Sequence, residues 1–360
     1  MALTDVRVGV VGTGGFANQV HLPGYHLHPK AKIVGVCDII MERAKYAAEK
    51  YDAAIVTQDY NELVASDEID AIDIVTPNVV HVPAALAAIR AGKHVICEKP
   101  LAMNQAEAQK LIDAAKATGA KTGVNFSYRG HPAARYTKDL IADGQIGSIY
   151  HINAFYMQGW LVNPKSPMVW RLQKDMTGTG SLGDLASHIV DLTMWFANDR
   201  ITSVAGDWHT FTSERPLADD SGTGTVDVDD ACDFLARFGK GAMGTFVSSR
   251  YGTSRGNYQR IEVYGDKGAL VYGWDDKNHI EVSIGDDARM YKWETIPVPD
   301  TYTTRDGSYG WTENVSNFID AIVEDRQMSP NFQDGLNNQA VLDAVAASAE
   351  NRAWVKVQSS

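Results

Sequence analysis

Hydrophobic residues in the first third of the chain gather in short runs rich in Val and Ile, and Ala-rich segments separate these runs. The runs predict strands at residues 6–11, 33–36, 69–75 and 94–97. Segments 82–91 and 105–117 carry apolar residues at the spacing of one helix face. Strands that are apolar on both faces and alternate with helices are typical of an open, doubly wound parallel sheet.

Past residue 123 the pattern changes to longer strands joined by turn residues. The expected strands are 149–157, 231–238, 242–248 and 261–264. Glycine-containing turns after two of them, 239–241 and 265–268, favour antiparallel hairpins. The alternation along 242–248 leaves one face of this sheet free, and we expect that face to pair subunits. Helices at 312–325 and 334–352 and an edge strand at 355–357 close the chain.

A chain of 360 residues exceeds the usual size of one hydrophobic core, so we expect two domains. The predicted fold class is α/β. Residues 1–123 form a doubly wound parallel sheet of the Rossmann type. Residues 124–360 form an α+β domain with a large, mainly antiparallel sheet, which binds substrate and carries the self-association surface. Segment 158–181, which contains Trp, Pro and several Gly residues, is expected to form a lid or a wall of the substrate site.

Charge and cysteine content exclude several classes of protein. The formal net charge of -12, without a basic patch, argues against nucleic-acid and anionic-membrane partners. Cys37, Cys97 and Cys232 have neither zinc-site spacing nor an even number for disulfides, which fits a reducing cytoplasm. The early strand at 6–11 leaves no room for a signal segment, and no apolar run reaches the length of a membrane span. We therefore expect a cytoplasmic location.

A glycine-rich turn follows the first strand. The residues are Gly12-Thr13-Gly14-Gly15-Phe16-Ala17. They match G-x-G-x-x-A, in which the first Gly makes the turn, the second admits a pyrophosphate and the third position packs helix on strand. The structural alternative is a tight strand-to-helix turn with no ligand, but the flanking strand and helix favour a dinucleotide site.

Asp38 at the end of the second strand supports the dinucleotide interpretation. A carboxylate in this position accepts hydrogen bonds from the adenosine ribose and repels a 2'-phosphate, so NAD is expected rather than NADP. Arg43 nearby leaves some tolerance of NADP.

Glu98-Lys99-Pro100 ends the strand at 94–97, at the carboxyl edge where open α/β sheets bind ligands. A Lys-Pro pair there is compatible with a plain solvated turn. A cation beside a nicotinamide would instead stabilise the alkoxide of a substrate alcohol as hydride leaves.

Asp184 and His188 stand four residues apart at the start of a predicted helix, so both side chains lie on one helix face. An imidazole can take a proton from an alcohol at neutral pH. A single His among apolar neighbours is more often structural, but the glycine-rich entry, Lys99 and the nucleotide motif favour a catalytic role.

Three motifs together resemble the Gfo/Idh/MocA family of glucose-fructose oxidoreductases and inositol dehydrogenases. They are the G-x-G-x-x-A turn, Glu98-Lys99-Pro100 and the segment from Gly183 to Asp191. Thr76-Pro77-Asn78 with His81, and Asn125 with Arg129, are similar to this family's cofactor-side and hinge segments. The resemblance implies NAD(P) chemistry on a hydroxyl group, with dimers or tetramers formed through the sheet face.

The resemblance places the reaction on three residues. His188 is expected to be the general base, Lys99 to polarise the hydroxyl and Asp184 to orient the substrate. Glu98 and the cofactor-side residues Thr76, Pro77, Asn78, His81 and Asn125 are expected to contact NAD, as are Gly12, Gly14, Gly15, Phe16, Ala17, Asp38, Arg43 and Lys99. Substrate contacts are expected from Lys99, Arg129, Tyr156, Trp160, Trp170, Arg171, Asp184 and His188.

The predicted activity is oxidation of a secondary hydroxyl of a sugar, glycoside or cyclic polyol to a ketone, which includes an inositol dehydrogenase. A redox-assisted glycosidase that retains NAD is an alternative, as is a nucleotide sensor without turnover. Aromatic residues near segment 158–181 favour a pyranose or glycoside. No metal is expected, because Lys99 and His188 supply charge stabilisation and proton transfer.

Overall fold

The computed structural model describes residues 4–358, and the chain divides into two compact units. Unit 1 comprises Met1–Ser127 and Gly310–Leu336, and unit 2 comprises Tyr128–Tyr309 and Asn337–Ser360. The sequence assigns residues 310–336 to the second domain, whereas the structure packs them with the first. Sequence order alone does not reveal this return of the chain.

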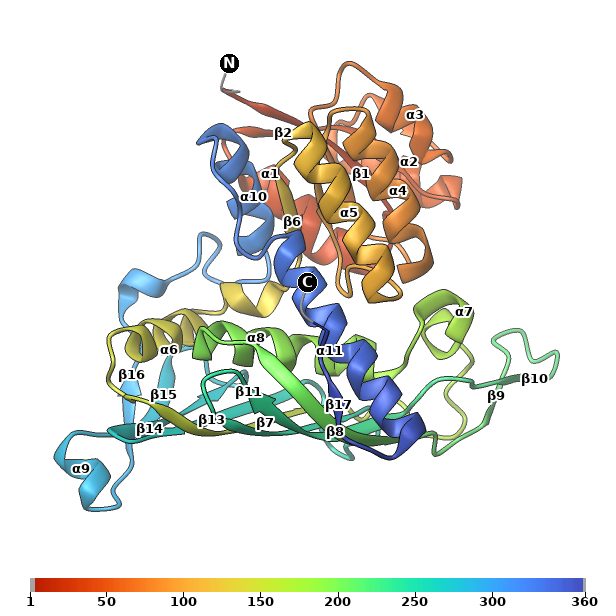
Figure 1. Cartoon of the computed structure of the whole chain (residues 1–360). Coiled ribbons are helices and arrows are strands. Elements are labelled where there is room, and N and C mark those ends of the chain that lie inside the picture. Colours follow the sequence, from red (N-terminus) through yellow and green to blue (C-terminus); the bar gives the residue numbers. More distant parts are fainter. Residues whose placement is uncertain (1–3, 359–360) are drawn as a thin grey trace. The chain divides into compact units, whose positions relative to one another are not determined.

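Unit 1 contains a six-stranded parallel sheet in the order β3-β2-β1-β4-β5-β6 (Figure 1). Its strands are β1 (Val6–Val11), β2 (Ala31–Cys37), β3 (Ile55–Thr57), β4 (Ala71–Ile74), β5 (His94–Cys97) and β6 (Thr122–Val124). The predicted doubly wound parallel sheet is confirmed. The strand order reverses between β1 and β4, and open α/β sheets bind ligands at the carboxyl ends of the strands beside such a reversal.

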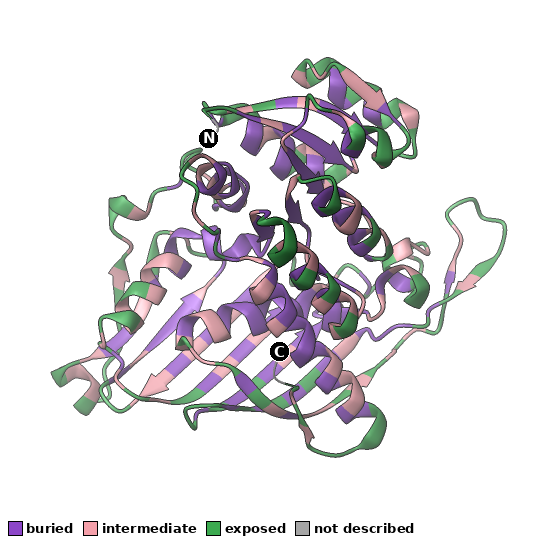
Figure 2. Cartoon of the chain, turned by 45° about the horizontal axis from the view of Figure 1, so that its top comes forward, coloured by how far each residue is buried: buried purple, intermediate pink, exposed green. Residues whose placement is uncertain are grey.

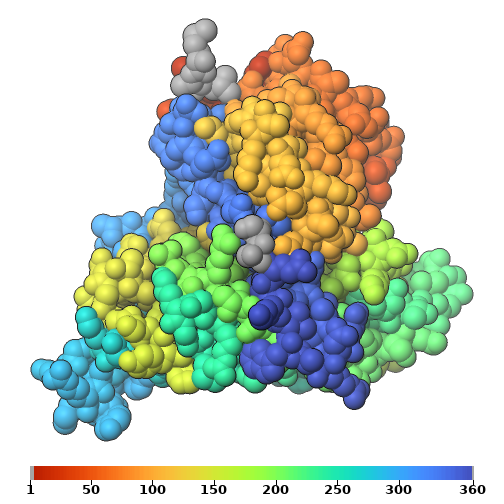
Figure 3. Space-filling model, in the orientation of Figure 1, coloured from red at the N-terminus to blue at the C-terminus, as the bar shows by residue number. Residues whose placement is uncertain are grey.

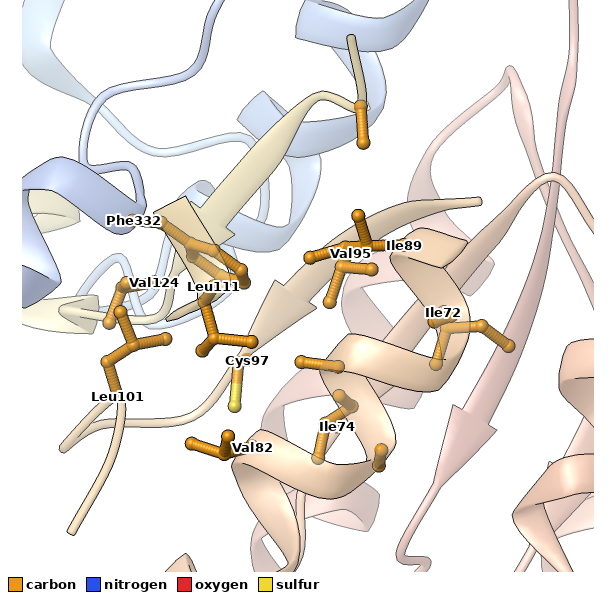
Figure 4. Close-up of a cluster of buried hydrophobic side chains, with 14 of the residues drawn as sticks. Ile72, Ile74, Val82, Ile89, Val95, Cys97, Leu101, Leu111, Val124 and Phe332 are labelled. Carbon is orange, nitrogen blue, oxygen red and sulfur yellow. The ribbon is translucent and has the colours of Figure 1, made fainter. Parts of the chain in front are cut away.

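One face of this sheet is covered by α3 (Tyr60–Ala65), α4 (Asn78–Arg90) and α5 (Gln105–Thr118). Their apolar side chains form a buried cluster with those of β4 and β5 (Figure 4). Phe332, at the start of α11 (Phe332–Asn351), joins this cluster beside Leu111 and Val124. The apolar residues of α4 and α5 therefore cover the sheet, as their spacing in the sequence predicts.

The opposite face is covered by α1 (Leu22–Leu27), α2 (Met41–Tyr51) and α10 (Glu313–Val323). Val315, Phe318 and Ile319 of α10 are completely buried against β1 and α1. A Cβ on Gly24 would lie 3.2 Å from Val315 Cγ1, so the small residue lets α1 and α10 approach closely. In Figure 3 the blue atoms of this segment lie against the red-to-yellow residues of the same unit.

Unit 2 is built on a nine-stranded sheet in the order β16-β15-β14-β13-β7-β12-β11-β8-β17. The strands are β7 (Ile149–Met157), β8 (Ile201–His209), β11 (Ala231–Phe238), β12 (Met243–Ser249), β13 (Tyr258–Gly265), β14 (Gly268–Gly273), β15 (His279–Ile284), β16 (Glu294–Pro297) and β17 (Val355–Lys356). Neighbours pair antiparallel except β7 with β12, which are parallel. The predicted large, mainly antiparallel sheet is confirmed.

One face of this sheet packs against α6 (Pro132–Ala142) and α8 (Ser187–Ala197), with α11 alongside. Along β11, every second residue is buried, and Figure 2 shows this alternation across the sheet. Ser348 of α11 accepts a hydrogen bond from the amide of Gly206 in β8 at 3.0 Å, which holds this part of the helix on the sheet. The other face stays open and carries apolar side chains such as Leu235 and Met243.

An aromatic cluster in unit 2 encloses His131, the residue that precedes α6. Its ring centroid lies 4.6 Å from that of Trp274, 5.5 Å from that of Tyr272 and 5.8 Å from that of Tyr309. Both ring nitrogens are buried without a hydrogen-bond partner in the described part of the chain. Burial lowers the pKa of His131 to about 3, so this imidazole is neutral in the folded protein at neutral pH.

We predict that His131→Phe removes a part of the acid sensitivity of unit 2. The folded-state pKa of about 3 is below the unfolded value of about 6.5, so the unfolded chain takes up the proton first and stability falls as pH drops through 6.5. Between pH 7 and pH 5 the variant should lose roughly 2 kcal/mol less unfolding free energy than the wild type. Urea unfolding followed by Trp fluorescence measures this difference, and parallel pH dependences would contradict the assignment.

Candidate active site

The glycine-rich turn after β1 has the shape of a phosphate cradle. Gly12 has φ +91°, and a Cβ there would lie 2.3 Å from the backbone oxygen of Val75, so the turn requires glycine. At Gly14 and Gly15 a Cβ would meet no atom within 4 Å, so the backbone faces open space. A pocket of about 390 Å³ opens there, lined by Thr13, Gly14, Gly15, Asn18, Glu42, Arg43 and Tyr46. Exposed backbone beside a helix start suits a pyrophosphate.

Ala17 begins the π-helical segment η1 (Ala17–His21), which leads directly into α1. The Ala17 side chain is fully buried, as the third position of the motif requires for close helix packing. The ring of Phe16 lies 5.6 Å from that of His21 and 6.3 Å from that of Trp311, between centroids.

Asp38 is joined to the glycine-rich turn. Its Oδ2 accepts hydrogen bonds from the Thr13 amide at 2.9 Å and from Thr13 Oγ1 at 3.2 Å, and its Oδ1 accepts from the Ile40 amide at 2.9 Å. These bonds hold the carboxylate at the end of β2, while Arg43 is exposed on α2 at the same pocket. The structure thus brings Asp38, Arg43 and the glycines together.

His81 connects two loops at the carboxyl ends of β4 and β5. Its Nδ1 lies 2.9 Å from the Pro100 oxygen and its Nε2 lies 3.0 Å from the Thr76 oxygen. Pro77 precedes α4, and Asn78 is its first residue. Burial lowers the pKa of His81. The structure therefore places His81 as a brace between the loops that begin at Thr76 and Glu98.

Glu98 is buried at the end of β5 in a polar cluster. Its Oε1 accepts a hydrogen bond from Asn125 Nδ2 at 2.6 Å and lies 3.0 Å from His21 Nε2, and its Oε2 accepts from the Lys99 amide at 3.2 Å. Burial disfavours the charge, but His21, Lys99 and Asn125 together hold the pKa of Glu98 below its ordinary value. Glu98 and Asn125, which are expected to contact the cofactor, thus both lie beside His21, a residue that the sequence analysis did not select.

In unit 2, Asp184 lies in the π-helical turn η4 (Leu182–Ala186), and His188 lies in α8 directly after it. π-helical turns recur at functional sites. The carboxylate of Asp229 binds the backbone at the start of this turn. Its Oδ1 accepts a hydrogen bond from the Gly180 amide at 2.6 Å, and its Oδ2 accepts one from the Leu182 amide at 2.8 Å. A Cβ on Gly180 would lie 1.8 Å from the Asp229 backbone oxygen, so glycine is required there.

Arg250, which follows β12, connects several predicted substrate residues. Its Nη2 lies 3.1 Å from Asp184 Oδ2, and its Nη1 donates to the Arg171 oxygen at 3.2 Å. The guanidinium carbon lies 5.6 Å from the ring centroid of Trp160. Arg250 is completely buried, whereas the Asp184 side chain is 21% exposed, so the arginine holds one side of a carboxylate that stays accessible.

Tyr156 brings the two predicted catalytic residues of unit 2 to one place. Its ring centroid lies 6.0 Å from that of His188, and the carboxylate of Asp184 is among the groups that, after burial, raise its pKa. The Tyr156 hydroxyl is hydrogen-bonded to Tyr128 Oη and to Asn257 Oδ1, each at 2.6 Å. The Tyr128 ring in turn lies 4.5 Å from the His188 ring, edge to face.

Arg129 and Trp170 each contact a charged side chain of unit 2. Arg129 is buried and donates from Nε to Asp191 Oδ2 at 2.8 Å, with its guanidinium 5.4 Å from the Trp195 ring centroid. Trp170 is half-buried, with the guanidinium of Arg171 at 4.4 Å from its ring centroid. Arg129 thus anchors α8, whereas Trp170 lies on the predicted substrate wall.

The wall segment 158–181 is held by Arg215 of β9 (Glu214–Pro216). This side chain is fully buried and donates to the backbone oxygens of Leu161, Asn163 and Ser166 and to Tyr251 Oη. The short helices η3 (Trp170–Leu172) and α7 (Lys174–Thr177) occupy its second half. These bonds fix a segment that the sequence predicts as a long irregular loop.

Comparisons with known proteins agree with this architecture. Residues 6–126 match the oxidoreductase family with an NAD-binding Rossmann fold, and residues 134–271 match the GFO/IDH/MocA C-terminal domain. The chain is 33% identical to the levoglucosan dehydrogenase of Pseudarthrobacter phenanthrenivorans over 387 aligned positions, which cover 99% of each chain.

The chain belongs to the Gfo/Idh/MocA oxidoreductase family. An oxidoreductase domain protein from Kribbella flavida has a similar crystal structure, with TM-score 0.92 and 35% identity over 99% of this chain and 100% of that one. A levoglucosan dehydrogenase in complex with NADH and levoglucosan gives TM-score 0.92 and 31% identity over the same shares. The family expected from the motifs is confirmed.

Unit 1 is the NAD-binding Rossmann domain of this Gfo/Idh/MocA member. The open space beside Gly14 and Gly15 and the carboxylate of Asp38 fit a dinucleotide, so the predicted cofactor is confirmed. Within residues 4–358, no group of three or more His, Cys, Asp and Glu side chains could hold a metal ion. Over the same range, no helix has the length and apolar character needed to cross a membrane.

Sequence reasoning missed four polar residues of this family member: His21, Asp73, Asp229 and Arg250. Each belongs to no local motif. The one available signal was position: His21 lies in the first turns after the glycine motif, and Arg250 directly follows a predicted strand.

We predict that Asp38→Ala weakens NADH binding about 10- to 100-fold, because it removes a hydrogen-bond acceptor for the ribose and for the Thr13 amide. Titration of NADH fluorescence measures the dissociation constant. Asp59→Ala is the matched control, since that exposed carboxylate also accepts a backbone hydrogen bond, from the Asn61 amide of α3. Equal NADH affinities in the two variants would refute the role of Asp38.

Proposed function

We propose that this chain is an NAD-dependent dehydrogenase that oxidises a secondary hydroxyl of a sugar, glycoside or cyclic polyol to a ketone. NAD, when bound, accepts the hydride from the carbinol carbon. The observation that carries the proposal is that Tyr156 links Asp184 and His188. Its ring lies 6.0 Å from that of His188, and its hydroxyl is influenced by the Asp184 carboxylate, which Arg250 holds. In this scheme unit 1 binds NAD, and unit 2 holds the substrate and the self-association surface.

His188 acts as the general base in this scheme. An imidazole is suited to remove a proton at neutral pH, and Tyr128 packs edge to face against its ring. Arg250 favours the ionised form of Asp184, so Asp184 accepts hydrogen bonds from substrate hydroxyls and orients the sugar. Lys99 polarises the reacting hydroxyl and stabilises the alkoxide.

The substrate class is inferred from the wall of unit 2 and from the relatives. Trp160 is partly exposed and Trp170 is half-buried, and aromatic faces suit the C–H surface of a pyranose ring. The relative of 33% identity acts on levoglucosan, an anhydrosugar. We therefore place levoglucosan first, followed by aldoses, glycosides and inositols.

We predict that NADH absorbance at 340 nm increases when the purified protein and NAD are mixed with one class of a substrate panel. The panel consists of levoglucosan, aldoses, glycosides and inositols. Lys99→Ala and His188→Ala should each lower kcat by at least about a hundredfold, because each removes a group that acts in the transition state. Their NADH affinities should stay within about twofold of the wild type.

The matched controls are Lys110→Ala and His209→Ala, which alter an exposed side chain of the same type in the same unit. Undiminished turnover in either active-site variant would reject the assigned roles. Release of aglycone without NADH would replace the dehydrogenase by the redox-assisted glycosidase, and NADH formed only with inositols would restrict the substrate to cyclic polyols.

We further propose that the open face of the nine-stranded sheet pairs subunits into a dimer or tetramer. Leu235 and Met243 are 48% and 41% exposed on this face, and the half-buried Phe155 and Val247 lie on the neighbouring strands. Apolar side chains clustered on an open sheet face favour association.

Leu235→Glu is expected to shift the mass measured by light scattering towards the monomer, because it introduces a charge among these apolar side chains. Lys240→Glu changes the charge of the exposed turn between β11 and β12 and serves as the control. A wild-type protein that is monomeric at micromolar concentration would refute the interface.

A further inference from the structure

A cluster of three buried ionisable groups lies in unit 1, directly beside the loop that carries Lys99. His21 ends η1, Asp73 lies in β4 and Glu98 follows β5. His21 Nδ1 lies 2.7 Å from Asp73 Oδ2, and His21 Nε2 lies 3.0 Å from Glu98 Oε1. The side chains of His21 and Asp73 are wholly inaccessible to solvent, and that of Glu98 is 10% exposed.

The geometry favours a proton on each ring nitrogen of His21, although Nε2 also lies 3.1 Å from the amide donor Asn125 Nδ2. A neutral imidazole donates one hydrogen bond, whereas here both nitrogens face carboxylate oxygens. Burial alone would disfavour the cation, but Asp73 and Glu98 raise the pKa of His21 to about 10. Two buried carboxylates in contact with one group also need a compensating positive charge.

The cation has a direct effect on the position of Glu98. Glu98 Oε1 receives both His21 and Asn125, which fixes the carboxylate from one side. Its other oxygen accepts the amide of Lys99, so the start of the loop that carries Lys99 is bound to the same carboxylate. The charge of Lys99 also acts on Glu98.

The same histidine connects this cluster to the cofactor turn. His21 lies four residues after Ala17 on one continuous helical segment, and the Phe16 ring packs against its imidazole. Other groups around the cluster are the Tyr25 hydroxyl and the Cys97 thiol, and the charge of Asp73 acts on both. His21 is the cation in contact with both buried carboxylates.

We propose that His21 is a cationic positioning residue, which through Glu98 fixes the loop that presents Lys99 to the substrate hydroxyl. This role rests on the proposed function of Lys99. It differs from a purely structural role, because it acts on kcat through one carboxylate, while His21 does not line the pocket beside Gly14, Gly15 and Arg43.

The test compares His21→Asn, Glu98→Gln and the double variant in the full-length protein. His28→Asn is the matched control, since His28 is also buried in unit 1 and pairs with a carboxylate, Asp320, at 3.0 Å. The measurements are kcat, KM and the pH profile of kcat with levoglucosan or the panel sugar of fastest turnover, together with NADH affinity.

We expect His21→Asn to lower kcat about tenfold or more with NADH affinity within about twofold, while His28→Asn matches the wild type. Without the cation, burial raises the pKa of the two carboxylates, so the kcat of His21→Asn should rise with pH beyond the point where the wild type is level. On the Glu98→Gln background, His21→Asn should change kcat by less than about twofold, because both substitutions remove one interaction.

A second measurement does not depend on turnover. In ¹⁵N spectra of histidine-labelled protein, the His21 signals should remain those of an imidazolium up to about pH 9. The ¹³C signal of reductively methylated Lys99 should shift in His21→Asn and not in His28→Asn. Should His21→Asn fail to fold, Glu98→Gln and the double variant, which carry less unpaired buried charge, provide the same comparison.

Titration of His21 below pH 8, an unmoved Lys99 signal, or additive effects of His21→Asn and Glu98→Gln on kcat would each overturn the proposal. If the wild-type protein oxidises no sugar of the panel, the proposed function is rejected instead. The two NMR measurements would then still test whether His21 is protonated and whether it affects Lys99.

Discussion

Compensation of buried charge is the physical constraint on which both units depend. In unit 1 the imidazole of His21 joins Asp73 and Glu98, and in unit 2 the guanidinium of Arg250 meets Asp184. Removing one member of a fully buried pair such as His21–Asp73 typically costs about 3–5 kcal/mol, because the remaining charge has no water to solvate it. Each ion pair therefore fixes side chains whose positions the proposed chemistry requires.

The strands were predictable where apolar residues repeat over a whole element. β1, β5, β7 and β11 have the bounds that the pattern predicts. β3 and β6 were missed, because three residues are too few to establish a period. β8 was missed because Gly206, Asp207 and His209 interrupt the apolar pattern in its second half. The return of α10 to unit 1 is a packing event between segments nearly 300 residues apart, which no local pattern contains.

The candidate site divides in the same way. Gly12, Asp38, Lys99 and the Asp184–His188 pair belong to motifs in which neighbouring residues specify the chemistry, so the sequence was sufficient to select them. The partners that hold these residues are distant in sequence: His21 and Glu98 are 77 residues apart, and Arg250 and Asp184 are 66 apart. A single sequence shows that Arg250 is charged, but only the fold shows that it is buried and which carboxylate it meets.

Arg215 gives the wall of unit 2 a property that affects how substrate preference can change. Its guanidinium binds three backbone oxygens of the segment that contains Trp160, so the main chain there is held by a residue that lies outside it. Side chains on the segment can then be exchanged without loss of the bonds that shape it, because those bonds involve only carbonyl groups. Under the proposed function, such a wall keeps its shape while its side chains change, so sugar preference can evolve by single substitutions rather than by rebuilding a loop.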